Sequence, residues 1–132
     1  MNVMTNNLLK ALFLSWSADT SFLANEWSKN NPARGQCVVS ALVVQDYLGG
    51  ELIRYHVKGD GIDEMHYVNS LEHGVTLDTT ASQYKEGTVL TLTHVDLAGF
   101  KTIRDKRLSD ADTYRRYKIL KQRVEAELTL LQ

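Results

Sequence analysis

The strongest constraint on the fold is a thirteen-residue run, Gln36 to Leu48, that is apolar on nearly every side and ends at Gly49 and Gly50. A helix with this pattern is buried on most of its faces, and glycine directly after a helix is its common C-terminal stop. The β-branched residues of the run would also suit a strand, but thirteen residues is long for a strand. The run therefore predicts a central buried helix.

The rest of the chain reads as helices before this run, strands after it and one more helix at the end. Apolar spacing predicts a first helix that begins near Thr5, followed by a weaker helical piece around residues 22–27. Strand-like runs occupy residues 51–58, 64–71, 75–79 and 88–95. Ser109 and Asp112 form a capping-box-like start to a long helix with an apolar stripe that reaches Leu131. This order predicts an α+β fold in which the strands form an antiparallel meander.

The length of 132 residues is that of one domain. We expect a single domain over residues 1–132, with a helical part at 1–50, an antiparallel sheet at 51–98 and an amphipathic helix at 109–131. Apolar residues make up 43% and charged residues 23%, as in globular proteins. The stripe on the last helix must bury itself against the rest of its own domain or against a second copy, so a homodimer through this helix is one alternative.

Composition also excludes several classes of protein and site. One cysteine rules out an internal disulfide and a four-cysteine zinc site, and no His, Cys or acidic group shows metal-ligand spacing, so we expect neither metal nor cofactor. A net charge of −1 argues against a general nucleic-acid binder. The apolar stretch 8–16 is too short for a membrane helix and is interrupted by Lys10. We therefore expect a cytoplasmic protein without a membrane partner.

Three residues in chain order could form a nucleophilic site. Cys37 lies at the first turn of the predicted central helix, where unpaired N–H groups and the helix dipole favour a thiolate. His66 and Asp78 follow on two consecutive predicted strands. A thiol nucleophile needs an imidazole to take its proton, and the imidazole needs an acceptor on its other nitrogen. These residue types in this order predict a Cys-His-Asp triad.

The triad depends on the turn between the two strands. If residues 72–74 form a three-residue turn, Leu71 faces Val75, and His66 and Asp78 lie on the same face one diagonal step apart. Diagonal neighbours are about 7–8 Å apart at the backbone, within reach of a His–Asp hydrogen bond. A two-residue turn would put the two side chains on opposite faces.

Four sequence blocks resemble the bacterial YunG-like family, within the papain-like group of thiol hydrolases that includes NlpC-type peptidases and transglutaminase-like proteins. The blocks are Trp16-Ser17-x-x-Thr20, Asn31-Pro32-Ala33-x-Gly35-Gln36-Cys37, residues 41–51 and His66-Tyr67-x-Asn69. They span about residues 15–84, and the block around the cysteine is the most specific. The resemblance implies a minimal papain-like fold, with the cysteine helix packed on the sheet.

The resemblance also implies roles for individual residues. Cys37 would be the nucleophile, His66 the general base and Asp78 the orienting acid. Papain-like proteases place an oxyanion-hole glutamine six residues before the cysteine, whereas this chain has Asn31 there and Gln36 next to Cys37. The expected oxyanion or substrate-binding groups are therefore the Cys37 backbone N–H with side chains from the following set: Asn31, Gln36, Trp16 and Asn69.

Two functional hypotheses follow. The preferred one is a cysteine hydrolase or acyltransferase of the amidase, peptidase or deamidase type, acting on a small-molecule, peptide or protein substrate. The alternative is a non-catalytic binding or assembly module that acts through its C-terminal basic, amphipathic helix. Residues 101–123 hold nine Lys and Arg against three Asp, a local charge of +6. Such a run is most often a solvated helix face, and an acidic or nucleic-acid partner is the sharper alternative.

Overall fold

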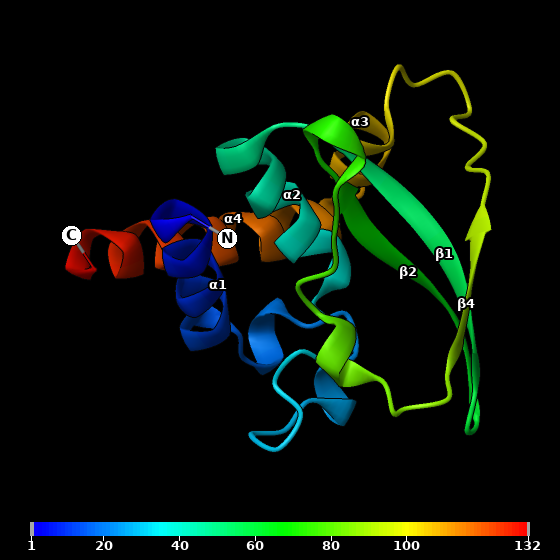
Figure 1. Ribbon diagram of the computed structural model, residues 1–132, viewed down its shortest axis with the longest axis horizontal. Helices are drawn as coiled ribbons and strands as arrows, with labels where there is room; N and C mark the ends of the chain where they lie inside the picture. Colours follow the sequence, from blue (N-terminus) through cyan, green and yellow to red (C-terminus); the bar gives the residue numbers. More distant parts are fainter. Residues whose placement is uncertain (1, 132) are drawn as a thin grey trace.

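The predicted central helix is present as α2 (Cys37–Leu48) in the structure, a computed structural model that describes residues 2–131. Residues 39–44 of this helix are all buried, as its apolar sequence requires. Gly49 ends the helix at φ 73°, and its N–H donates to the Gln45 carbonyl over 2.9 Å. Figure 1 shows α2 in the middle of the molecule, between the sheet and the outer helices.

The first and last helices are present, but each begins at a different cap from the predicted one. Helix α1 (Val3–Ser15) begins after Asn2, whose side chain accepts the Thr5 N–H over 2.8 Å. Helix α4 (Ala111–Leu130) begins after Asp110, whose carboxylate accepts the Thr113 N–H over 2.9 Å. In both cases the cap is the residue whose side-chain oxygen reaches the N–H three positions later.

A short helix that the sequence reading missed explains the displaced cap of α4. Helix α3 (Ile103–Leu108) is capped by Thr102, and Ser109 ends this helix in a helical conformation. Ser109 is therefore a C-cap instead of the predicted N-cap. The weaker helical piece predicted around residues 22–27 is reduced to a single 3₁₀ turn, Ala24–Glu26.

Four antiparallel strands follow α2 and complete the α+β fold. They are β1 (Glu51–Gly59), β2 (Ile62–Ser70), β3 (Thr76–Leu77) and β4 (Val89–Thr93). The sheet order is β3-β2-β1-β4, so the predicted meander holds for the first three strands and is wrong for the fourth. Strand β4 returns to pair with β1, which offers it five partners, whereas β3 is only two residues long.

The predicted turn between β2 and β3 is confirmed. Asn69 pairs with Leu77, and the Leu71 N–H donates to the Val75 carbonyl over 2.7 Å, which is the register of a three-residue turn. His73 lies at the centre of this turn with φ 64°. Asp78 follows directly after β3, on the same face as His66.

The core lies around α2, which packs on the sheet through one side and against α1 and α4 through the others. Its buried apolar side chains include Leu12, Leu42, Leu52, Leu120 and Val124. The centre of the α4 stripe therefore packs inside its own chain, while Tyr114 is 47% exposed. The buried residues of the stripe are Tyr117, Leu120 and Val124. Among residues 2–131, no helix has both the length and the apolar character to cross a bilayer.

Candidate active site

Cys37 is the first residue of α2 and is half-buried at the wall of a cavity of about 360 Å³. The N-cap residue Gln36 makes no side-chain hydrogen bond to the helix, so no capping side chain occupies the first N–H groups. Gly35 lines the same cavity with φ 75°, a conformation that glycine adopts without strain. The thiol therefore lies at an uncapped helix N-terminus and faces a cavity.

His66 and Asp78 are held together behind the cysteine. The imidazole is fully buried, and its Nε2 donates to Asp78 Oδ2 over 2.8 Å. The other carboxylate oxygen accepts the Thr80 N–H over 3.2 Å. Asp78 is thus both the acceptor for His66 and the start of the turn that follows β3. The hydrogen bond from the Thr80 N–H orients the carboxylate, and the carboxylate in turn orients the imidazole.

The second imidazole nitrogen is the one available to the thiol. His66 Nδ1 is buried and has no hydrogen-bond partner among the described residues. Burial alone would lower the pKa of His66, but the hydrogen bond to Asp78 and the nearby Cys37 thiol raise it to about 9. Because Asp78 occupies Nε2, Nδ1 is the ring nitrogen that remains for a second hydrogen bond.

Charged and aromatic residues that the sequence reading did not single out surround the imidazole. Tyr84 stands edge-on to the His66 ring at 5.1 Å and donates its hydroxyl to Glu64 over 2.8 Å. Both oxygens of Glu64 accept from the buried Arg34, over 2.6 and 2.8 Å. Burial would raise the pKa of Glu64, but the hydrogen bonds from Arg34 and Tyr84 hold it below its usual value. Glu64 is therefore an ionised carboxylate near the site, and its negative charge is balanced by Arg34.

The four residues expected to bind substrate or an oxyanion do not line the Cys37 cavity. Trp16 donates its indole N–H to Ser40 Oγ over 2.9 Å, and Asn69 donates to the Ala41 carbonyl over 2.9 Å. Both side chains are buried and tie α2 to its neighbours. Their roles in this structure are those of packing residues, because their polar groups already have partners inside the chain.

The side-chain amides of Gln36 and Asn31 also donate hydrogen bonds within the chain. The Gln36 side-chain amide donates to the Ser17 carbonyl over 2.9 Å, and its oxygen is buried with no hydrogen-bond partner among residues 2–131. Asn31 donates to the Gln83 carbonyl over 3.2 Å. These bonds fix the loop before Cys37 against distant segments. Of the expected oxyanion donors, the Cys37 backbone N–H is the one at the cavity.

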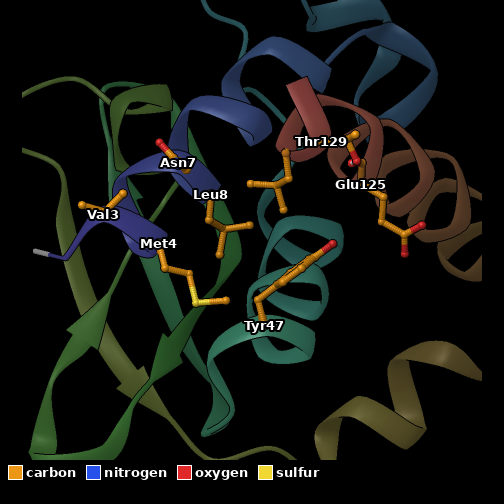
Figure 2. A pocket seen from close by; sticks show the side chains of 8 residues that line it. Val3, Met4, Asn7, Leu8, Tyr47, Glu125 and Thr129 are labelled. Atoms are coloured by element: carbon orange, nitrogen blue, oxygen red, sulfur yellow. The ribbon is translucent and has the colours of Figure 1, made fainter. Parts of the chain in front are cut away.

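A second hollow of about 480 Å³ lies between α1, α2 and α4 (Figure 2). Its lining residues include Val3 and Met4 from α1, Tyr47 from α2, and Glu125 from α4. It holds no cysteine or histidine. Across residues 2–131, no group of three or more His, Cys, Asp and Glu side chains is placed to hold a metal ion. Cys37 lines the cavity at the start of α2 and not this hollow.

Much of the basic segment 101–123 is used within the chain. Arg104 pairs with Asp46 at 2.7 Å, Arg116 with Asp112 at 2.8 Å, and Arg123 with Asp19 at 2.6 Å. The Arg104 pair ties α3 to α2 and the Arg123 pair ties α4 to the loop after α1, whereas the Arg116 pair lies within α4. Asp46 and Asp19, from elsewhere in the sequence, thereby neutralise part of the excess positive charge of the segment.

Comparison with known proteins identifies a family but no solved relative. A sequence model described as the YunG protein matches residues 4–129. A Bacillus subtilis (strain 168) protein described as "Uncharacterized protein YunG" is 37% identical over 71 residues, which is 54% of this chain. The matched region spans about half, 55%, of that protein's own length. No solved structure matches the chain significantly.

Proposed function

The chain belongs to the YunG family, and for this chain we propose the activity of a cysteine-dependent acyl-transfer enzyme with a Cys37-His66-Asp78 triad. The observation that carries the proposal is the pairing of His66. Its Nε2 is fixed by Asp78, while its buried Nδ1 has no hydrogen-bond partner within residues 2–131 and the Cys37 thiol is close enough to raise the pKa of the imidazole. A purely structural histidine that is fully buried would be expected to bond through both nitrogens.

The proposed reaction has two steps. Cys37 Sγ attacks the carbonyl carbon of an amide or ester, and its proton passes to His66 Nδ1. The C–N or C–O bond breaks, and the leaving amine or alcohol takes that proton from His66. Water then attacks the thioacyl intermediate, giving a proton to His66, and the acid is released as the thiol is restored. An amine in place of water would give transfer instead of hydrolysis.

The surrounding groups support this chemistry. Asp78 holds one proton of the imidazole on Nε2 and stabilises the imidazolium that pairs with the Cys37 thiolate. The Cys37 N–H, at the uncapped start of α2, is the proposed donor to the oxyanion. The order of helix-borne cysteine followed by strand-borne histidine and acid also supports a minimal papain-like fold, and we include that fold and a cytoplasmic location in the proposal.

Alkylation of the single cysteine tests the proposal. The rate of Cys37 modification by iodoacetamide would be followed between pH 5 and 10 in the parent protein and in His66→Gln, which roughly preserves side-chain volume. Since there is one cysteine, the signal has no other source. We expect the parent rate at pH 6 to exceed that of a free thiol by about 10-fold or more, and the excess to disappear in the variant.

Folding of the variant is checked by circular dichroism and by its urea midpoint. If His66→Gln does not fold, the pH profile of the parent protein decides alone, because an activated thiol and a free thiol differ at pH 6. A thiol that reacts like a free one, or that does not react while the protein is folded, would contradict the enzyme proposal. That result would favour the non-catalytic binding module.

A further inference from the structure

The cavity in front of Cys37 combines apolar walls with positive charge. Phe22, Leu23, Val38 and Met65 supply apolar surface. The charged side chains at the same cavity are three arginines and one glutamate: Arg54, Arg107, Arg116 and Glu64. The net charge at the cavity depends on which of these four side chains form ion pairs inside the protein.

Glu64 and Arg116 are both neutralised. Arg34 binds both oxygens of Glu64, so this carboxylate contributes little net negative charge. Arg116 is 2% exposed and its Nε donates to Asp112 over 2.8 Å. Each of these charges has an opposite charge at hydrogen-bond distance, and neither leaves an excess at the cavity.

The positive charges of Arg54 and Arg107 are not compensated by a neighbouring carboxylate among the described residues. Within residues 2–131, no carboxylate lies at ion-pair distance from either one. Arg54 donates only to neutral oxygens, Thr93 Oγ1 and the His94 carbonyl, both over 2.9 Å. These bonds hold the guanidinium in place without compensating it.

Arg107 is fixed in a similar way. Its guanidinium carbon lies 5.8 Å from the centre of the Tyr67 ring, and one terminal nitrogen donates to Thr113 Oγ1 over 3.2 Å. Its Nε is buried and has no hydrogen-bond partner in the described part of the chain. An arginine that is held between a ring and a hydroxyl, with no anion beside it, is already oriented to bind an anionic ligand.

We propose that the substrate of the Cys37 site carries a carboxylate, bound by Arg54 and Arg107, next to an apolar acyl or amide portion that lies against the cavity wall. This inference rests on the proposed function, since it names the substrate class of the same thiol. A planar guanidinium fork matches the two oxygens of a carboxylate. In a cavity of about 360 Å³, a small acidic acyl compound or the carboxylate end of a peptide would fit.

Two thiol reagents that differ in charge test the proposal directly. Iodoacetate carries a carboxylate and iodoacetamide is its neutral counterpart, and both transfer their methylene carbon to sulfur with loss of iodide. We expect the iodoacetate-to-iodoacetamide rate ratio at Cys37 to fall about 10-fold in the Arg54→Gln/Arg107→Gln double variant. The two single variants should give intermediate ratios.

Arg115→Gln is the matched control. It removes the same type of charge from an exposed position on α4 that does not line the Cys37 cavity. Its rate ratio should equal that of the parent protein. Equal ratios in the parent, the control and the double variant would overturn the carboxylate proposal, while leaving the iodoacetamide pH profile, and so the enzyme proposal, intact.

A binding measurement decides the proposal if Cys37 does not react with iodoacetamide, the result that contradicts the enzyme proposal. The arginine Nε–H signals of ¹⁵N-labelled protein would be followed by NMR during titration with N-acetylglycine and with its neutral amide. The proposal predicts that N-acetylglycine causes saturable shifts of the Arg54 and Arg107 signals and that the neutral amide does not. Equal responses to both compounds, or no shift, would overturn it.

Discussion

His66 shows how far single residues of the site could be predicted. The length of the 72–74 turn fixed which face of the sheet His66 and Asp78 share, so their hydrogen bond followed from counting residues. The partners of Trp16 and Asn69 could not be found in this way. Their donors reach Ser40 and Ala41 on α2, and no local pattern predicts which buried acceptor a distant side chain will meet. Burial by tertiary packing decided their role.

Replacement of Asp78 by asparagine tests the proposed orientation of the imidazole. Asp78→Asn removes the negatively charged carboxylate beside Nε2 and so lowers the pKa of His66 from about 9. We expect the protein to fold, because asparagine retains an oxygen for the Thr80 N–H, and we expect iodoacetamide modification at pH 6 to slow by about 10-fold or more. The rate-against-pH profile measures the change.

Asp63→Asn is the matched control for this experiment. Asp63 accepts from His56 over 2.6 Å in an exposed His–Asp pair on the same hairpin, away from the cysteine. Cys37 reactivity in this variant should equal that of the parent protein. If the two variants react equally with iodoacetamide, Asp78 has no part in activating the thiol.

The elements of the fold were predicted better than their ends. The run 36–48 predicted α2 because an all-round apolar helix has one stable location, the interior. The caps of α1 and α4 were misplaced by a few residues, since several Ser, Thr, Asn and Asp residues near each start can serve as a cap. The position of β4 beside β1 was missed, because strand pairing depends on a free edge that exists only after the hairpin has formed.

The approach of the chain to α2 depends on Gly35. This residue has φ 75°, and a Cβ there would lie 2.2 Å from Ser21 Oγ and 2.8 Å from the Leu23 N atom. We expect Gly35→Ala to lower the free energy of unfolding by about 3 kcal/mol or more, since it combines left-handed strain with a clash. In the fraction that folds, displacement of the start of α2 should also slow Cys37 modification.

Gly61→Ala separates strain from crowding. Gly61 has a similar φ of 80° in the β1–β2 turn, but nothing lies within 4 Å of an added Cβ. Only the conformational cost, about 1 kcal/mol, should appear there. Urea denaturation of both variants measures the loss in free energy of unfolding. Equal losses in the two variants would show that the crowding of the added Cβ by Ser21 and Leu23 has no effect on stability.

The whole molecule is joined by charge pairs between segments far apart in the chain. Arg34, next to the site, binds Glu26 in the preceding loop, Glu64 on β2 and Gln83 after β3. Arg123 on α4 binds Asp19 in the loop after α1 through two nitrogens, over 2.6 and 2.9 Å. Sequence spacing gives no sign of such pairs, because the partners are brought together only when the helices and the sheet have packed.

The Asp19–Arg123 pair predicts a pH dependence of stability. The hydrogen bond from Arg123 is the main cause that lowers the pKa of Asp19 from 3.8 to about 2. A lowered folded-state pKa gives stability that is present above about pH 4 and is lost as the pH falls through about 2. Both side chains are 39–49% exposed, so we expect a contribution of at most about 1 kcal/mol.

Urea denaturation of the parent protein and of Asp19→Asn at pH 5 and pH 2 measures this contribution. The parent should be the more stable protein at pH 5, and the gap should narrow at pH 2, where protonated Asp19 resembles asparagine. Arg123→Gln should reproduce the same pattern, because either partner's loss breaks the pair. A gap of the same size at both pH values would mean that the charge of Asp19 does not help to hold α4 against the loop after α1.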